Sequence, residues 1–217
     1  VVMLLCLIAI AITLPGDKPL PASSYRGTLK SMFSLLRHNK TLHTSAARSA
    51  TAYASFFALW SCISYRMKAS PFFASDDIIG SLGLCGIAGA SCVIILSKHT
   101  QAWGSRRCSI VGAVSMLFAW FMALVFDGYF VSIVITVLII DAGMQCIHLS
   151  NQTKVVTSNN VNTNSLNALY MILYFIGGTL GTLTAGILWV KYQWIGTIAI
   201  GISFTLISLF ISILTTD

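Results

Sequence analysis

The feature that most constrains this chain is a series of long apolar stretches separated by short polar connections. Six of them are long enough to cross a hydrocarbon core of ~30 Å, which takes about 20 residues of helix. They cover residues 47–67, 78–96, 108–126, 129–150, 165–190 and 193–214. Only 9% of the residues are charged, against about 25% in a soluble domain. We therefore predict an all-α membrane protein with a six-helix transmembrane bundle.

A shorter apolar stretch, residues 1–14, precedes these six and is too short to span the bilayer. It has no initiator Met, no basic flank and no small-x-small cleavage site, so it fits a signal peptide poorly. We interpret it as the end of a truncated transmembrane helix and expect Val1 to lie inside a longer reading frame. The predicted organisation is a partial helix over 1–14, a cytoplasmic linker over 15–46 and the bundle over 47–217.

The basic residues predict the side of the membrane on which each connection lies, because Lys and Arg beside spans stay in the cytoplasm. With 15–46 inside, the outer connections hold only Arg66, Lys68 and Lys191. The inner connections hold Lys18, Arg26, Lys30, Arg37, Lys40, Arg48, Lys98, Arg106, Arg107 and Lys154. This favours a multi-pass protein of a bacterial inner membrane with its C-terminus in the cytoplasm. The charge of +7 is thus explained by topology, and no nucleic-acid partner is expected because a basic, aromatic-rich soluble surface is missing.

The linker contains a basic amphipathic segment. From Tyr25 to Leu36 apolar residues recur at helical spacing, with basic residues on the other faces, and Ser23 or Ser24 is a candidate N-cap. Two interpretations remain. The helix lies in the headgroup plane and is attracted to anionic lipid, or its apolar side packs on the bundle.

The most informative polar residue is Asp141, the only acid inside any predicted span. A carboxylate at the bilayer centre costs at least ~2.5 kcal/mol. Gln145, His148 and Gln152 follow on the same helix face, within about 60° of arc. We predict that this stripe faces a cavity or another helix and belongs to a solute or proton pathway, for which an imidazole is suited. Alternatively, Asp141 only hydrogen-bonds a neighbouring helix, and His148 is simply hydrated near the cytoplasmic end.

The next span carries a matching face within about 80° of arc. It comprises Asn167, Tyr170, Tyr174, Gly178 and Gly181, with Gly177 beside it. We expect the Asn and the two Tyr to lie near the pathway, although a Tyr near a span's end can simply mark the interface. The three glycines are predicted to let a partner helix approach closely. Gly80, Gly83, Gly86 and Gly89, at three-residue steps, are predicted to pack in the same way.

Catalytic motifs are missing from the sequence. HExxH, GxSxG and a Walker lysine loop do not occur, and a membrane aspartyl protease would need a second buried carboxylate. The six cysteines contain no CxxC pair. We therefore expect no enzymatic activity, no metal site and no organic cofactor.

Two runs of residues carry a resemblance to a known family. They are Asp141-Ala-Gly-Met-Gln145-Cys-Ile-His148-Leu-Ser-Asn151-Gln152 and Leu166-Asn167-Ala-Leu-Tyr170-Met171-Ile-Leu-Tyr174-Phe175-Ile-Gly177-Gly178-Thr-Leu-Gly181. The chain resembles the C-terminal half of major facilitator superfamily transporters, most of all bacterial exporters of the drug:proton antiporter type. The resemblance implies helices seven to twelve of a twelve-helix fold, with residues 1–14 as the end of helix six.

The resemblance also implies a mechanism, alternating access, in which two six-helix halves rock about a midplane site. It suggests proton-coupled export of a small organic solute, with the proton gradient as driving force and a missing N-terminal half as partner. Asp141 and Gln145 would then line the cavity, and Asn151 and Gln152 would stabilise its cytoplasmic mouth. The alternative is a stand-alone six-helix scaffold or sensor that does not transport.

The inner connection over residues 97–107 lines up with the family's gating motif G-x-L-A-D-R-x-G-x-R-R. Gly104, Arg106 and Arg107 match this motif, together with a basic Lys98. Gln101 stands where the motif has an acid, so a charge-based latch at that position is not expected. Gly104, Arg106 and Arg107 are the candidate gating residues of this connection.

Overall fold

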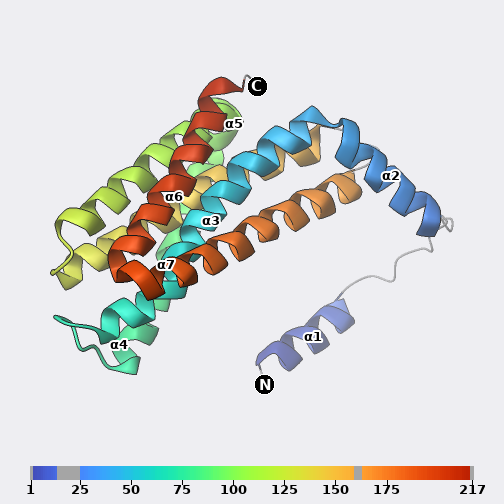
Figure 1. Ribbon diagram of the computed structural model, residues 1–217. Coiled ribbons are helices and arrows are strands. Elements are labelled where there is room, and N and C mark those ends of the chain that lie inside the picture. Colours follow the sequence, from blue (N-terminus) through green and yellow to red (C-terminus); the bar gives the residue numbers. More distant parts are fainter. Residues whose placement is uncertain (1, 14–24, 159–162, 216–217) are drawn as a thin grey trace.

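The computed structural model describes residues 2–13, 25–158 and 163–215 (Figure 1), without the side chains of 87–90, 92–102 and part of the first two helices. The candidate caps Ser23 and Ser24, the start of the linker and the end of the C-terminus lie outside the described residues. The elements are α1 (Val2–Thr13), α2 (Tyr25–His38), α3 (Lys40–Lys68), α4 (Asp76–Ser81), a 3₁₀ turn η1 (Leu82–Leu84), α5 (Cys85–Val125), α6 (Phe130–Thr157) and α7 (Thr163–Leu214).

The predicted fold class is confirmed: the chain is an all-α membrane protein. Three stretches of the described chain are long and apolar enough to cross a membrane, namely Trp103–Val125 in α5, Phe130–Thr157 and Thr163–Leu214. Figure 1 shows α3, α5, α6 and α7 gathered into one bundle, with α1 apart from it.

Two of the long helices contain a sharp break where the sequence suggested a loop. The break in α5 falls at Gly104, with φ 75°, and the break in α7 falls at Gln193, with φ 53°. A positive φ is comfortable for glycine, which explains why the first break lies at Gly104. In Figure 1, α7 turns back on itself at its break, from the orange to the red segment. The connections predicted at these two positions are thus single-residue breaks within the described chain.

The helix α3 packs mainly against α7 and also against α6, whereas α5 packs mainly against α6. Helix α3 contains the predicted span 47–67. It is not one of the three stretches of the described chain that are long and apolar enough to cross a membrane. Its buried face carries Ser45, Ser49 and Ser55 among alanines. Small and hydroxylated residues suit a helix that contacts other helices closely, since packing and hydrogen bonds, not hydrophobicity, hold helices together in lipid.

The closest backbone approach described for α3 and α7 involves two glycines. A Cβ on Gly177 or Gly181 would collide with the backbone of Ala50 or Ala54, and one on Gly178 would come 2.8 Å from the Tyr53 ring. The close packing predicted for Gly80, Gly83 and Gly86 is not found within the described chain, because a Cβ there would meet no described atom within 4 Å; the surroundings of Gly89 lie outside what the structure describes. Regular spacing of glycines therefore did not distinguish a helix contact from an open surface.

The end of α3 that we predict to be outside is tied to the turn between α5 and α6. Arg66, which is buried, donates from Nε to Asp127 Oδ1 over 2.8 Å and lies 4.8 Å from the centre of the Phe72 ring. At the opposite end, α2 is the amphipathic helix expected from Tyr25 onward. Its residues Met32, Leu35 and Leu36 pack on the bundle beside Leu42, Leu166 and Leu169.

The structure shows the bundle packing that one interpretation of the amphipathic helix predicts, and the interfacial interpretation stays a prediction. One apolar face packs on the bundle, while Leu29 and Phe33 remain 48% and 69% exposed. Exposed apolar side chains next to basic ones are typical of a helix that lies at the membrane interface. We therefore expect α2 to contact the bundle and the headgroup region at the same time.

Candidate functional site

The polar stripe of α6 begins at Asp141, which is 4% exposed. Its Oδ2 atom is buried and has no hydrogen-bond partner among the described residues. Leaving a buried polar atom unpaired costs free energy, and a carboxylate in a membrane helix usually marks a functional site. Gln145 and His148 follow on the same helix and are half-buried. The stripe is therefore directed into protein and not fully hydrated.

The middle of the stripe meets a group of aromatic rings. The His148 ring lies 4.3 Å from the Tyr174 ring and 5.7 Å from the Tyr170 ring, measured between centroids. Tyr53 of α3 stacks on Tyr174 with centroids 3.8 Å apart and planes inclined by 18°. Three helices thus contribute to one aromatic cluster, which we define as Tyr53, His148, Tyr170 and Tyr174.

A hydrogen-bond network centres on the fully buried Tyr170. Its hydroxyl lies 2.8 Å from Ser49 Oγ, 3.1 Å from the His148 carbonyl oxygen and 3.2 Å from His148 Nδ1. A phenol has one proton to donate and lone pairs to accept with. Ser49, Tyr170 and His148 can therefore exchange donor and acceptor roles, which is the arrangement that a proton relay needs.

The polar residues near the C-terminal end of α6 contact two neighbouring helices. Gln152 Nε2 donates to Asn167 Oδ1 over 3.0 Å and so joins α6 to the first half of α7. Asn151, fully buried, donates from Nδ2 to Ser109 Oγ of α5 over 2.7 Å. The structure thus brings Gln152 and Asn167 together, whereas Asn151 contacts a different helix. The neighbouring residues Asn151 and Gln152 therefore link α6 to α5 and to α7, respectively.

The predicted gating residues lie where α5 meets the end of α7. Arg106 donates from Nε to the Ser212 carbonyl over 3.1 Å and from Nη2 to the Ile213 carbonyl over 2.8 Å. The buried Arg48 of α3 donates to the Thr215 carbonyl over 3.0 Å. The last carbonyls of a helix lack intrahelical partners and carry partial negative charge, so cations stabilise them. Arg107, by contrast, is exposed.

Sequence reasoning missed the contribution of α3. Ser49 and Tyr53 complete the aromatic cluster and its network, and Arg48 binds the end of α7. A detectable signal was the unusual number of hydroxylated and small residues in a helix long enough to span. No group of three His, Cys, Asp or Glu side chains that could hold a metal occurs within the described residues.

The chain is similar to curated proteins that are named as transporters. It is 30% identical over 211 residues to "Uncharacterized transporter YgaY" of Escherichia coli O157:H7, covering 96% of this chain and 54% of that protein. Identity and coverage are the same for "Putative uncharacterized transporter YgaY" of Escherichia coli K12. "Uncharacterized transporter" of Buchnera aphidicola is 24% identical over 161 residues, with 73% of this chain and 39% of that protein covered.

The chain spans about half the length of the curated relatives it matches first. No family model matches the sequence. No solved structure matches the fold.

Proposed function

We propose that this chain is part of a secondary active membrane transporter of the major facilitator type, which moves a small organic solute by alternating access. Three observations support the proposal: the long apolar helices, the similarity to proteins named as transporters and the buried polar stripe of α6. Because the relatives are about twice as long, a second six-helix half would supply the opposite wall of the cavity. The bilayer and the solute are then its other partners.

The observation that carries this proposal is the buried Oδ2 of Asp141, which lacks a partner in the described chain. An apolar residue there would avoid the cost of an unpaired carboxyl, so its presence is best explained by a role in transport. Asp141 and Gln145 would line the central cavity, and Asp141 would take up and release a proton during each cycle. The proton gradient would drive export without any cofactor or catalytic step.

The aromatic cluster extends this role toward the cytoplasmic side. Tyr53 is partly exposed and combines an apolar ring with a polar hydroxyl, which suits an organic solute, while the buried Tyr174 stacks against it. Ser49, Tyr170 and His148 form a chain of groups that can pass a proton, with neighbouring distances of 2.8 and 3.2 Å. Gly104 and Arg106 would position the inner end of α5 against α7 while the two halves move, with Arg107 nearby. In this topology the C-terminus lies in the cytoplasm of a bacterial cell.

The test uses the full-length protein in proteoliposomes that enclose a pH-sensitive dye. A panel of small amphiphilic solutes is added under an imposed pH gradient, and the solute-driven pH change is recorded. We expect the change in Asp141→Asn to fall at least tenfold, whereas Asp77→Asn, at an exposed position, stays near wild type. Unchanged coupling in Asp141→Asn would remove Asp141 from the proton path. A wild-type protein without any solute-driven pH change would favour the scaffold or sensor.

A further inference from the structure

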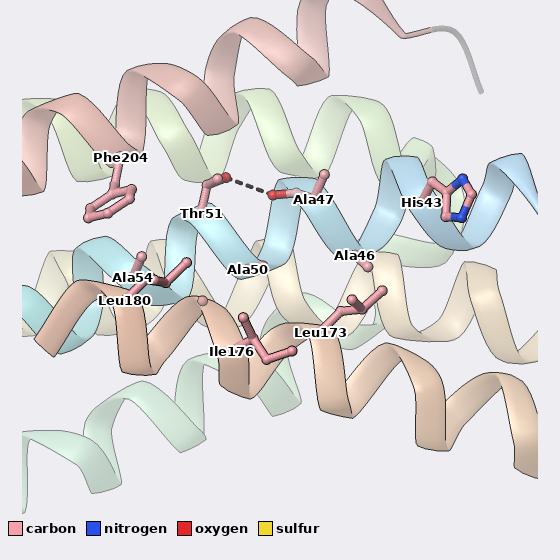
Figure 2. A pocket seen from close by; sticks show the side chains of 11 residues that line it. His43, Ala46, Ala47, Ala50, Thr51, Ala54, Leu173, Ile176, Leu180 and Phe204 are labelled. Carbon is pink, nitrogen blue, oxygen red and sulfur yellow. Dashed lines mark hydrogen bonds between the residues drawn. The ribbon is translucent and has the colours of Figure 1, made fainter. Parts of the chain in front are cut away.

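An apolar groove of about 350 Å³ opens on the surface of the bundle between α3 and the two halves of α7. Figure 2 shows small side chains along α3, with Leu173, Ile176 and Leu180 of the first half of α7 on one side of it and Phe204 of the second half on the other. Ile176 and Leu180 are each half exposed. The lining is almost entirely apolar and lies along a helix that we place across the membrane, so the groove suits an apolar occupant better than water.

One end of this groove is basic. His43 lies at that end (Figure 2), and its Nε2 contacts the Leu36 carbonyl, which holds the end of α2 against the start of α3. Arg37 in the last turn of α2 and Lys40 at the start of α3 are exposed close to His43 in the chain. The sequence contains no Asp or Glu between residues 18 and 75. The corner therefore carries several cations with no acidic side chain nearby in the chain.

We propose that the groove binds an acyl chain of an anionic phospholipid whose headgroup lies at the basic corner between α2 and α3. The groove matches the tail and the cations match the phosphate, so two parts of one molecule are complemented by adjacent parts of the protein. The count of basic residues places this corner on the cytoplasmic side, where anionic lipids are attracted to basic segments beside a span. Leu29 and Phe33, exposed on α2, set this helix at headgroup depth.

Charge complementarity distinguishes a lipid from the other possible occupants. A protein helix would match both features only if it carried acidic residues at the end that meets the corner. A second copy would bring the same acid-free segment to the same place, where like charges repel. A zwitterionic lipid would fill the groove but gain little from the corner. The anionic lipid satisfies both features, and its binding does not depend on which solute is transported.

The first test needs no substitution. The full-length protein is placed in nanodiscs with traces of phosphatidylglycerol or phosphatidylcholine that carry a photoreactive group in the middle of one acyl chain. After irradiation, labelled peptides are mapped by mass spectrometry. We expect phosphatidylglycerol to label residues 43–54 and 173–180 at least fivefold more than phosphatidylcholine, and both lipids to label the exposed α5 surface around Val114 and Phe118 equally. Equal labelling of the groove by the two lipids, or an unlabelled groove, would overturn the proposal.

The second test distinguishes the contribution of the lipid headgroup to binding from that of its acyl chain. Each of Arg37→Gln and Lys40→Gln is expected to lower groove labelling by phosphatidylglycerol about fivefold, the effect of one basic residue near an anionic surface. Lys191→Gln, an exposed cation at the other end of the bundle, serves as the control. Ala47→Trp is expected to fill the groove and to reduce labelling by both lipids, with Val190→Trp on the exposed side of α7 as its control. Labelling that is insensitive to Arg37 and Lys40 would contradict the headgroup site even if Ala47→Trp fails to fold.

Discussion

The polar side chains in the interior of this bundle differ widely in how many hydrogen-bond partners they have. The Tyr170 hydroxyl has three partners within 3.2 Å, whereas Asp141 Oδ2 has none among the described residues. In a membrane, hydrogen bonds between helices stabilise the fold by about 0.6 kcal/mol on average and up to ~1.7 kcal/mol. Tyr170 therefore contributes to the fold as well as to the candidate relay, whereas the buried Asp141 Oδ2 has no described partner that offsets its cost.

Replacing Tyr170 by Phe tests this difference. Tyr170→Phe removes the hydroxyl and leaves Ser49 and the His148 carbonyl without this partner, so we expect a loss of about 1 kcal/mol in the free energy of unfolding. The measurement is a reversible titration with a denaturing detergent, followed by helical circular dichroism. Tyr192→Phe, at an exposed position of α7, should leave the midpoint unchanged. A Tyr170→Phe midpoint equal to wild type would show that the network does not stabilise the bundle.

Among the helices, the contact of α3 with the first half of α7 is the closest one described. It depends on glycines because the backbone of α3 occupies the space that a Cβ of Gly177 or Gly181 would need. This contact also places Ser49 and Tyr53 against Tyr170 and Tyr174. The close packing of two helices thus builds the aromatic cluster, so a wider spacing should weaken both the fold and the site.

The variant Gly177→Ala measures the importance of this spacing. The added methyl group would collide with the Ala50 backbone, and overpacking of this kind costs about 1–3 kcal/mol. Gly186→Ala on the same helix is the matched control, since a Cβ there meets nothing within 4 Å and alanine favours helix formation. We expect the detergent midpoint to fall in the first variant and to stay level or rise in the second. A lower midpoint for Gly186→Ala than for Gly177→Ala would contradict the described contact between Gly177 and Ala50.

The helices and part of the site could be predicted from the sequence because both depend on local patterns. Runs of apolar residues indicate spans, and polar residues at helical spacing placed Asp141, Gln145 and His148 on one face. Residues 97–107 were predicted as a loop, yet the helix continues to a break at Gly104. A hydropathy pattern detects that this stretch is polar, but it does not show that the backbone stays helical on both sides of a single residue with positive φ.

The contributions of Ser49 and Tyr53 could not be predicted, because they depend on which helices are neighbours. These residues lie more than a hundred positions before Tyr170 and Tyr174 in the sequence. Their partners are set by the crossing of α3 and α7, and periodicity describes only the faces of one helix at a time. The glycines also show that the sequence does not reveal which helices are neighbours. A Cβ on Gly177 would collide with α3, whereas one on Gly80 would meet no described atom within 4 Å.

Considered as a unit, the bundle has an apolar exterior and a polar interior that only a membrane and close helix contacts can support. Large apolar side chains are exposed on α5 (Phe118) and on both halves of α7 (Phe175 and Phe210), as expected for a surface in contact with lipid. Asp141 and Asn151 are buried. This division supports placing the transport pathway along α6, and it can be measured without knowing the solute.

The decisive measurement is the accessibility of a spin label attached to cysteine 145 in the variant Gln145→Cys, in a background without other cysteines and in lipid bilayers. Collision with oxygen, which concentrates in lipid, is compared with the same label in Phe118→Cys on the apolar exterior of α5. If the stripe of α6 faces protein or a cavity, collisions with oxygen at position 145 will be several-fold fewer than at position 118. Equal collision rates at the two positions would mean that the stripe faces lipid, and would contradict the proposed pathway.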